Sequence, residues 1–432
     1  MDIELLRKTW ASEVKFIQFQ FTNILGQLKG VELPASSLVN VNKIGIDASS
    51  VGLAPTKKSD LVLWPDISTF YLLPWVSQSN VCAIMCEVHE LDTNKLDADP
   101  RSILRRTLEK IHDEMGLFYR TRPELEFYLL KEDFIPFDNA GYMSLPPIDK
   151  GSLLRREIVD KMSYFELFAK TLHSECGPGQ NEVEFEFNDA MKSADGLQFT
   201  KQLVRMLAPK YNARVTFMPK PFADAAGSGL HIHQIVCNTE GENIFCKKDG
   251  GLSKEAEYFV GGLLNYVDEI LAFCCPTINS YKRLVVGHEA PVYKTWGIGN
   301  RTALIRVPGY ESGRLEFRVG DPSMNIYLVL ALLLAAGVEG IKNQIEPPEP
   351  STVDLDSYTK EQLIEMNVEL LPKTLEEAIK KAETSSFVKQ IISSDLLEIF
   401  VRTKKEEIDS FKKEVGEFNS EKIEPWEIKH YG

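Results

Sequence analysis

The sequence lacks a hydrophobic run long enough to cross a bilayer. Its longest apolar stretch, Ile326–Val338, has 13 residues, whereas a membrane-spanning helix needs about 20. We therefore expect no membrane partner and interpret this stretch as a buried helix. The acidic start, Met1–Glu4, is not followed by an apolar run, so the sequence predicts no signal peptide.

Basic charge, paired cysteines and common nucleotide-binding motifs are also scarce. Lysines and arginines number 49 against 63 acidic residues, a formal net charge of −14, which argues against a nucleic-acid partner. The seven cysteines are scattered without a CxxC pair, so a reducing cytoplasm is expected rather than a disulfide framework or zinc site. No Walker A motif, helix-opening GxGxxG or Ser/His/Asp signature is present.

The remaining composition and periodicity indicate a folded α+β protein. Hydrophobic residues make up 44% and charged residues 26% of the chain, as in globular domains. Short β-rich runs predict a small N-terminal β domain over residues 1–100, and helices mixed irregularly with strands predict a larger domain over 101–432. The expected helices are Ser102–Glu114, Ser152–Ser174, Leu197–Leu207, Glu255–Phe273 and a charged helical region over 370–417.

Two strand-like segments carry alternating glutamates. Glu124 and Glu126 share one face of a strand because side chains alternate along it. Glu182, Glu184 and Glu186 alternate in the same way after a glycine-proline turn, and periodicity does not say which of them is functional. Neighbouring buried carboxylates repel each other unless a cation lies between them. The alternative for each strand is a solvated acidic face.

Histidines and arginines cluster later in the chain. The segment Gly227-Ser-Gly-Leu-His231-Ile-His233 places two histidines on one strand face after a glycine-rich loop, where they could bind a metal or phosphate, or be satisfied core histidines. The region from Arg283 to Arg318 is rich in arginine. Arginine forks bind carboxylates and phosphates, which favours a nucleotide triphosphate as substrate, although structural salt bridges are the alternative for each single arginine.

In their order along nearly the whole chain, these segments resemble glutamine synthetase of the class I type found in bacteria and archaea. The motifs that carry the resemblance are Ile46-Asp47-Ala-Ser-Ser50, Glu124-x-Glu126, Glu175 with Gly179-Gln-Asn-Glu182, Met218-Pro-Lys-Pro, Gly227-Ser-Gly-x-His231-x-His233, Asn279-Ser-Tyr-Lys-Arg283, Glu289-Ala-Pro, Asn300-Arg301 and Glu316-x-Arg318. The resemblance implies a β-grasp-like N-terminal domain and a catalytic domain, glutamine-synthetase-like, with a curved antiparallel sheet flanked by helices. It also implies a homododecamer of two hexameric rings with active sites shared between neighbours.

The resemblance implies a role for each matching residue. Two Mg²⁺ or Mn²⁺ ions per active site would be held by Glu126, Glu175 and Glu182, and by Glu124, His231 and Glu316. The implied ATP-binding residues are His233, Arg301, Arg306 and Arg314. Substrate-binding roles fall on Ser50, Tyr142, Gly227, Arg283 and Arg318. The implied catalytic residues are Asp47, Glu289 and Arg301, with Glu289 on a flap that closes the site.

The implied reaction is ATP-dependent ligation of ammonia to the γ-carboxylate of L-glutamate through γ-glutamyl phosphate, giving glutamine, ADP and phosphate. Four positions depart from the pattern of family members that make glutamine: Lys170, Ala226, Ile235 and His288. They leave open a γ-glutamyl ligase for a larger amine such as a polyamine, ethanolamine or an alkylamine. A non-catalytic family member is the third possibility.

Overall fold

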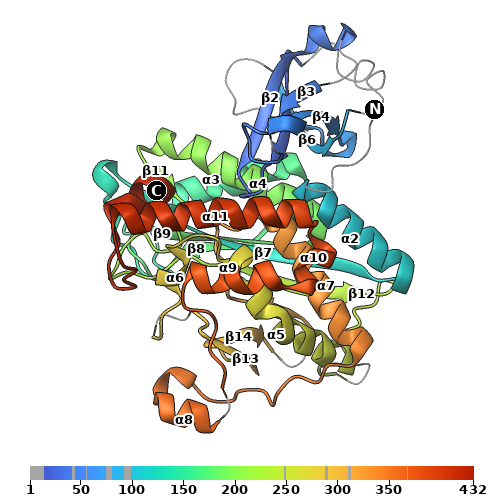
Figure 1. Cartoon of the computed structure of the whole chain (residues 1–432). Coiled ribbons are helices and arrows are strands. Elements are labelled where there is room, and N and C mark those ends of the chain that lie inside the picture. The colour runs from blue at the N-terminus through green and yellow to red at the C-terminus, as the bar shows by residue number, and fades with distance from the viewer. Residues whose placement is uncertain are drawn as a thin grey trace.

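The computed structural model describes residues 14–40, 44–54, 56–73, 80–91, 99–247, 250–287, 290–309, 313–366 and 368–432. Two sheets organise these residues. The smaller sheet stands above a larger body in which helices surround the second sheet (Figure 1). The expected α+β class is therefore confirmed.

The N-terminal sheet has the strand order β2-β1-β6-β4-β3, and β5 pairs with β6. Its strands are β1 Phe16–Thr22, β2 Leu28–Pro34, β3 Ile44–Asp47, β4 Asp60–Pro65, β5 Tyr71–Leu72 and β6 Val81–His89. The alternation along β1 separates two faces. Phe19 and Phe21 enter a small core of their own, whereas Gln20 faces the larger body and donates to Gln202.

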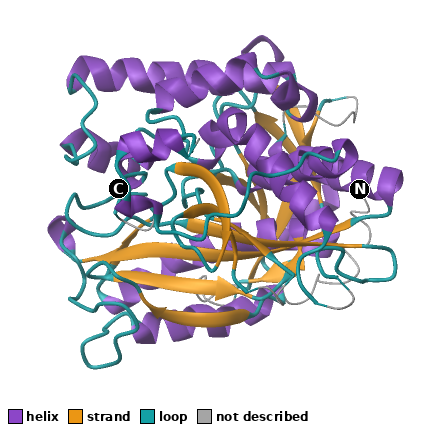
Figure 2. Cartoon of the chain, turned by 90° about the horizontal axis from the view of Figure 1, so that it is seen from below, coloured by secondary structure: helices purple, strands orange, loops and turns teal. Residues whose placement is uncertain are grey.

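The larger sheet has the order β13-β14-β15-β12-β7-β9-β8, and β10 and β11 also pair with β7. Its strands are β7 Phe118–Leu130, β8 Ala169–Ser174, β9 Gln180–Phe185, β10 Asn188–Asp189, β11 Arg214–Thr216, β12 Leu230–Cys237, β13 Tyr293–Ile298, β14 Ala303–Val307 and β15 Leu315–Phe317. The family resemblance implies an antiparallel sheet. All the strand pairs of this sheet are antiparallel except β13 with β14, which run parallel, so the sheet is mixed. Figure 2 shows its long strands running between helices.

Most of the predicted helices lie where the sequence places them. The helices are α2 Pro100–Met115, α3 Ser152–Met162, α4 Ala190–Leu207, α5 Lys254–Cys274, α6 Ser280–Arg283, α7 Ile326–Asn343, α8 Lys360–Glu365, α9 Leu375–Thr384, α10 Ser386–Ile391, α11 Ser394–Glu414 and α12 Pro425–Tyr431. The prediction of one helix over 152–174 is wrong. Helix α3 ends at Met162, Glu166 has a φ of 53°, and Ala169–Ser174 instead forms β8 because its backbone pairs with β9.

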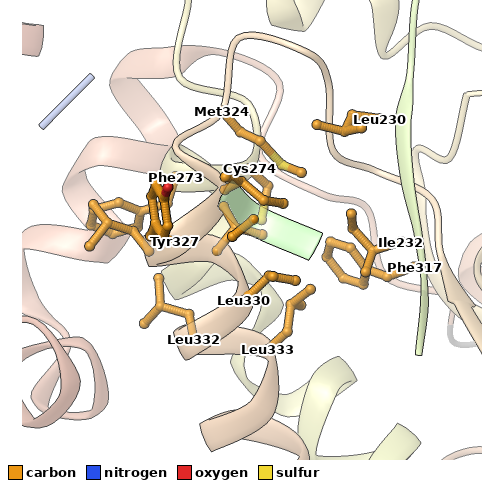
Figure 3. Packing of buried hydrophobic residues seen from close by; sticks show 14 of the residues in the cluster. Leu230, Ile232, Phe273, Cys274, Phe317, Met324, Tyr327, Leu330, Leu332 and Leu333 are labelled. Carbon is orange, nitrogen blue, oxygen red and sulfur yellow. The ribbon is translucent and has the colours of Figure 1, made fainter. Parts of the chain in front are cut away.

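The apolar run of α7 forms the centre of the core. The helix is long and apolar enough to cross a membrane, but 78% of its apolar window is buried inside the protein, as the sequence predicts for a core helix. Figure 3 shows Leu330 and Leu333 of α7 beside Ile232 of β12 and Phe317 of β15. Each of these strands therefore buries one face against α7 and turns the alternate residues to the opposite face.

Candidate active site

The register of the large sheet places the predicted polar residues side by side on that opposite face. Glu124 of β7 lies opposite His231 of β12 and opposite Glu184 of β9. Glu126 lies opposite Glu182 in the same way. Leu125 and Phe127, which alternate with these glutamates, are fully buried. Antiparallel pairing thus brings together carboxylates and imidazoles that lie far apart in the sequence.

The first cluster contains Glu124, His231 and Glu316, whose ligand atoms all lie within 4.8 Å of one another. Nδ1 of His231 lies 3.2 Å from Glu124 Oε2. Burial lowers the pKa of His231, and the nearby Arg318 adds to the effect. A neutral imidazole has a lone pair for a metal. Although burial opposes it, hydrogen bonds with His231 and His233 hold the pKa of Glu124 well below its usual range.

The second cluster contains Glu175, Glu182 and His173, again with ligand atoms within 4.8 Å of one another. Glu126 lies next to this cluster, but it is not one of the three residues whose ligand atoms lie within 4.8 Å of one another. His173 belongs to the cluster, although it is not among the site residues that the sequence predicts. Burial raises the pKa of Glu126 well above its usual range, and Glu175 and Glu182 raise it further. Burial also raises the pKa of Glu182 to about 7. A hard divalent cation would stabilise these crowded carboxylates, so the donor set fits Mg²⁺ or Mn²⁺.

Backbone and amide groups of two loops hold Glu126 in place. Its Oε2 accepts from the Gly229 N–H at 2.8 Å and from Gln180 Nε2 at 3.2 Å. A Cβ on Gly229 would lie 2.5 Å from His231 Nε2 and 2.7 Å from an Arg283 nitrogen. A larger residue at that position would have to displace His231 or Arg283. Gly227 is equally close-packed, because a Cβ there would lie 2.6 Å from Cγ of Arg283.

A third group, Glu124, Glu184 and His233, also has ligand atoms within 4.8 Å. Glu184 is already neutralised, because it pairs with Arg122 at 2.6 Å and with Lys170 at 3.3 Å. These cations make the group a poor metal site. Arg122 is not among the residues predicted from the sequence, although it stands two positions before Glu124, and the strand register that joins it to Glu184 is needed to recognise its role.

Several side-chain nitrogen atoms at this end of the face, most of them arginine donors, have no partner among the described residues. They are Nε of Arg122, Nε of Arg306, Nε of Arg314 and Nδ1 of His233, all buried. Arg306 and Arg318 both bind Glu316, at 2.6 and 2.5 Å. Although burial opposes it, Arg318 lowers the pKa of Glu316 to about 2. Unpartnered buried donors are costly, and a polyphosphate would accept from them.

The arginines predicted to bind glutamate lie at the site but are turned to protein atoms. Arg283 is 4% exposed. Its guanidinium donates to the carbonyls of Val319 at 2.8 Å and Arg318 at 3.2 Å. Arg318 also donates to the Arg301 carbonyl. The Arg301 side chain is exposed in the turn between β13 and β14. The carboxylate-binding roles of Arg283 and Arg318 stay predictions.

The residues predicted for the ammonium pocket are divided between the two sheets. The Tyr142 ring lies 5.5 Å from that of His173, and burial together with Glu175 raises the Tyr142 pKa. Asp47 is exposed in the N-terminal sheet, where hydrogen bonds from Ser50 and Ser49 lower its pKa to about 2. Both serine hydroxyls donate to its carboxylate, and so does the Ser49 N–H. Glu289 and His288 lie outside the described residues.

Comparison with known proteins agrees with this geometry. Residues 97–430 match the model of the glutamine synthetase catalytic domain, and residues 13–91 match that of the glutamine synthetase β-grasp domain. The glutamine synthetase of Thermotoga maritima is 37% identical over 100% of this chain and 99% of its own length. The enzyme of Pyrococcus horikoshii is 39% identical over 97% of this chain and 96% of its own. A solved structure of a GmaS/ADP complex superposes with a TM-score of 0.84, at 29% identity and 99% coverage of both chains.

The matches and the acidic, arginine-lined face therefore place the chain among the carbon–nitrogen ligases of the glutamate–ammonia ligase family. Relatives that match over essentially their whole length establish the family as well as the fold. The chain belongs to the glutamine synthetase family. The acceptor amine and the role of each residue are separate questions.

Proposed function

We propose that this protein ligates ammonia to the γ-carboxylate of L-glutamate, forming γ-glutamyl phosphate from ATP and then glutamine, ADP and phosphate. The observation that carries the proposal is the face on which five glutamates and His231 adjoin buried arginine donors without partners among the described residues. Carboxylates suit hard divalent ions, and arginine forks suit phosphate, so one face combines the two requirements of phosphoryl transfer. The family relatives named glutamine synthetase support the same reaction.

Two metal positions follow from the clusters. Glu124, His231 and Glu316 would hold one ion, and Glu126, Glu175 and Glu182 the other, with His173 beside the second. Divalent ions bound there would neutralise charge on the phosphates and on the transferred phosphoryl group. Arg306, Arg314 and His233 would bind the phosphates of ATP, as the sequence predicts. We add Arg122, whose Nε is buried and has no partner among the described residues.

A second copy of the chain would complete the proposed ammonium pocket. Asp47 has a pKa lowered to about 2, so it would be ionised near neutral pH and could bind NH₄⁺ by its charge, whereas so low a pKa makes it a weak acceptor for the ammonium proton. It lies exposed in the N-terminal sheet, however, whereas Tyr142 and Glu175 lie in the catalytic body. We propose that Asp47 and Ser50 serve the site of a neighbouring copy within a dodecamer of two hexameric rings. The predicted flap residue Glu289 would close that site against water.

The second candidate is a γ-glutamyl ligase for a larger amine. Two solved structures that superpose on this chain are of GmaS, a γ-glutamylmethylamide synthetase. The loop where family members that make glutamine usually have asparagine carries Ala226 instead, and its carbonyl accepts from the Tyr128 hydroxyl at 2.6 Å. A methyl group in place of an amide removes a polar group from this loop, and this departure from the pattern of glutamine-forming relatives motivates the second candidate. A non-catalytic role is the third candidate.

Phosphate release in the presence of ATP and glutamate separates the three candidates. Ammonium, methylamine, ethanolamine, putrescine and spermidine would be supplied in turn, first with Mg²⁺ and then with Mn²⁺. Release with ammonium alone is expected. Faster release with a larger amine would replace the proposal by the second candidate, and no release with any amine would favour the third.

A matched pair of variants tests the site in the same assay. Glu182→Gln removes a buried carboxylate of the second cluster, whereas Glu186→Gln makes the same change at an exposed residue just after β9. We expect the first to lose activity and the second to keep it. Equal activity of the two variants would contradict the assignment of the second cluster.

Two further predictions from the sequence stay proposals. We propose that the domain division falls near residue 100, where Asp99 caps the first turn of α2 by accepting from the Ser102 N–H. We also propose a cytoplasmic location. The seven cysteines are free thiols, which suits a reducing compartment.

A further inference from the structure

A large cavity among the described residues lies away from the candidate active site. It has a volume of about 830 Å³, lies between the N-terminal sheet and the catalytic body, and opens to solvent beside the exposed Arg205. Gln18 and Gln20 of β1 form one wall, Lys201 and Arg205 of α4 another, and Trp426 of α12 a third. No residue of the three carboxylate clusters lines it. A volume of this size accommodates a small organic ligand.

The cavity carries cations without carboxylate partners. Lys201 is 8% exposed, donates to the Pro322 carbonyl at 2.6 Å and lies 5.1 Å from the Phe217 ring. Arg205, one helical turn later, lies 4.7 Å from the same ring. No ion pair joins either cation to a carboxylate among the described residues, and the charge of Asp321 only partly offsets the effect of burial on Lys201. Burial, reinforced by Arg205, lowers the pKa of Lys201 to about 7, so a negative charge here would stabilise both groups.

The two glutamates that line the cavity are already engaged. Glu32 accepts from Gln18 Nε2 at 3.0 Å. Glu407 pairs with Lys404 at 2.8 Å and accepts from the Tyr431 hydroxyl. The lining therefore has an excess of positive charge that its own carboxylates do not neutralise.

Two buried polar atoms on the lining also have no partner among the described residues. They are Nε1 of Trp426, a donor, and Oε1 of Gln20, an acceptor. Both side chains are more than nine-tenths buried. A buried polar atom without a partner costs free energy that a ligand would recover. An anionic acceptor would complement Trp426 and the cations, and an N–H or O–H donor would complement Gln20.

We propose that this cavity binds a small organic anion, a carboxylate or phosphate on a skeleton that also carries a hydrogen-bond donor. The anionic group contacts Arg205, Lys201 and Trp426, and the donor contacts Gln20. The site is distinct from the substrate face, and ligand binding here does not depend on the proposed ligase reaction.

The wall formed by α12 connects the cavity to the active site. Trp426 precedes Glu427, whose carboxylate accepts from Lys282 and from Asn279 Nδ2. Asn279 also holds the backbone of Lys220 in the loop that leads to Gly227. Lys282 precedes Arg283, which contacts His231. A ligand that contacts Trp426 can therefore shift the residues that position Arg283. Ligand binding in the cavity is expected to change the KM for glutamate about threefold or more, with a smaller effect on kcat.

Binding is tested by titration calorimetry on the intact protein without ATP or glutamate. The probes are inorganic phosphate, succinate and glucose 6-phosphate, which distinguish a bare anion, a carboxylate and a phosphate ester. Tryptophan fluorescence, compared with a Trp426→Phe variant, reports whether the ligand lies at α12. We expect at least one organic probe to bind with a Kd of roughly 1 mM or tighter.

The double variant Lys201→Met, Arg205→Met should bind that probe at least about tenfold more weakly. The control is Lys210→Met, because Lys210 is exposed and lies shortly after α4. This variant should bind the probe as the wild type does. Circular dichroism checks that each variant is folded. The proposal is overturned if no organic probe binds to the wild type, if the double variant binds it equally well, or if Trp426→Phe leaves the fluorescence change intact. Because no substrate is present, failure of the proposed ligase activity would leave this test unaffected.

Discussion

Replacing Glu427 by glutamine would leave a positive charge without its partner in the interior. Glu427 and Lys282 form an ion pair of 2.5 Å in which both side chains are 0% exposed. Glu427 also accepts from Asn279 at 2.8 Å and from the Glu424 N–H at 2.8 Å. The pair joins the C-terminal helix α12 to α6, whose last residue is Arg283.

The structure allows the size of the effect to be worked out. Removing one partner of a buried ion pair costs about 3–5 kcal/mol. Glutamine keeps the shape and can still contact Asn279, so the loss should lie near the lower value, about 3 kcal/mol. Adding Lys282→Met to Glu427→Gln removes the unpaired charge. The double variant should therefore recover about 1 kcal/mol or more of the loss.

Urea unfolding, followed by tryptophan fluorescence, measures the urea concentration at which each protein is half unfolded. We expect this midpoint to be highest for the wild type, lower for the double variant and lowest for Glu427→Gln. Glu383→Gln is the matched control because Glu383 pairs with Lys405 at the surface, where the side chains are 45% and 51% exposed. Its midpoint should change little, since exposed pairs contribute about 0–1 kcal/mol. A kinetic assay on the folded variants should show a raised KM for glutamate.

Two results would refute this reasoning. The first is a Glu427→Gln midpoint as high as that of Glu383→Gln, which would mean that the pair contributes no more than a surface contact. The second is a double variant less stable than Glu427→Gln alone, which would mean that the unpaired Lys282 charge is not the source of the loss.

Three further predictions follow from single positions. Gly229→Ala should abolish activity with little loss of fold, because its Cβ would press on His231 at 2.5 Å; circular dichroism unchanged but activity intact would count against it. Glu126→Ala should weaken Mn²⁺ binding measured calorimetrically, because one carboxylate that neutralises the ion is lost; two undiminished binding events would contradict the second metal position. The pKa of Lys201 is lowered from 10.5 to about 7, so the unfolded chain binds more protons between these values and stability should rise with pH there. Lys201→Met should flatten that rise in the urea midpoint, and an unchanged slope would show that Lys201 is not responsible.

The strand faces were predictable because the side-chain period of a strand is two. Glu124 and Glu126 lie on one face of β7, and His231 and His233 on one face of β12, as the alternation predicts. The family resemblance adds Glu316, which no local pattern connects with them. The buried helix α7 follows from its uninterrupted apolar run, because so apolar a surface has to be covered by the rest of the protein.

Partnerships across strands could not be predicted in this way. Arg122 binds Glu184 only because β7 and β9 pair in one register, and a shift by one residue would turn either side chain to the core. The periodicity over 152–174 was misleading for a different reason. Phe165 is buried as the helical stripe predicts, but Phe168 is 62% exposed because the chain turns at Glu166 before entering β8.

The central position of β7 has a consequence for the order in which the protein can fold. β7 ends at Leu130, but the strands that cover its two edges, β9 and β12, come at Gln180–Phe185 and Leu230–Cys237. During synthesis this long strand, one face of which is apolar, is complete well before either edge can be paired, and strands with unpaired edges can associate wrongly. A metal ion cannot assist at that stage, because the last carboxylate of the first cluster, Glu316, is made later still. Correct folding of the N-terminal half of the chain therefore depends on rapid synthesis of the strands that pair with β7.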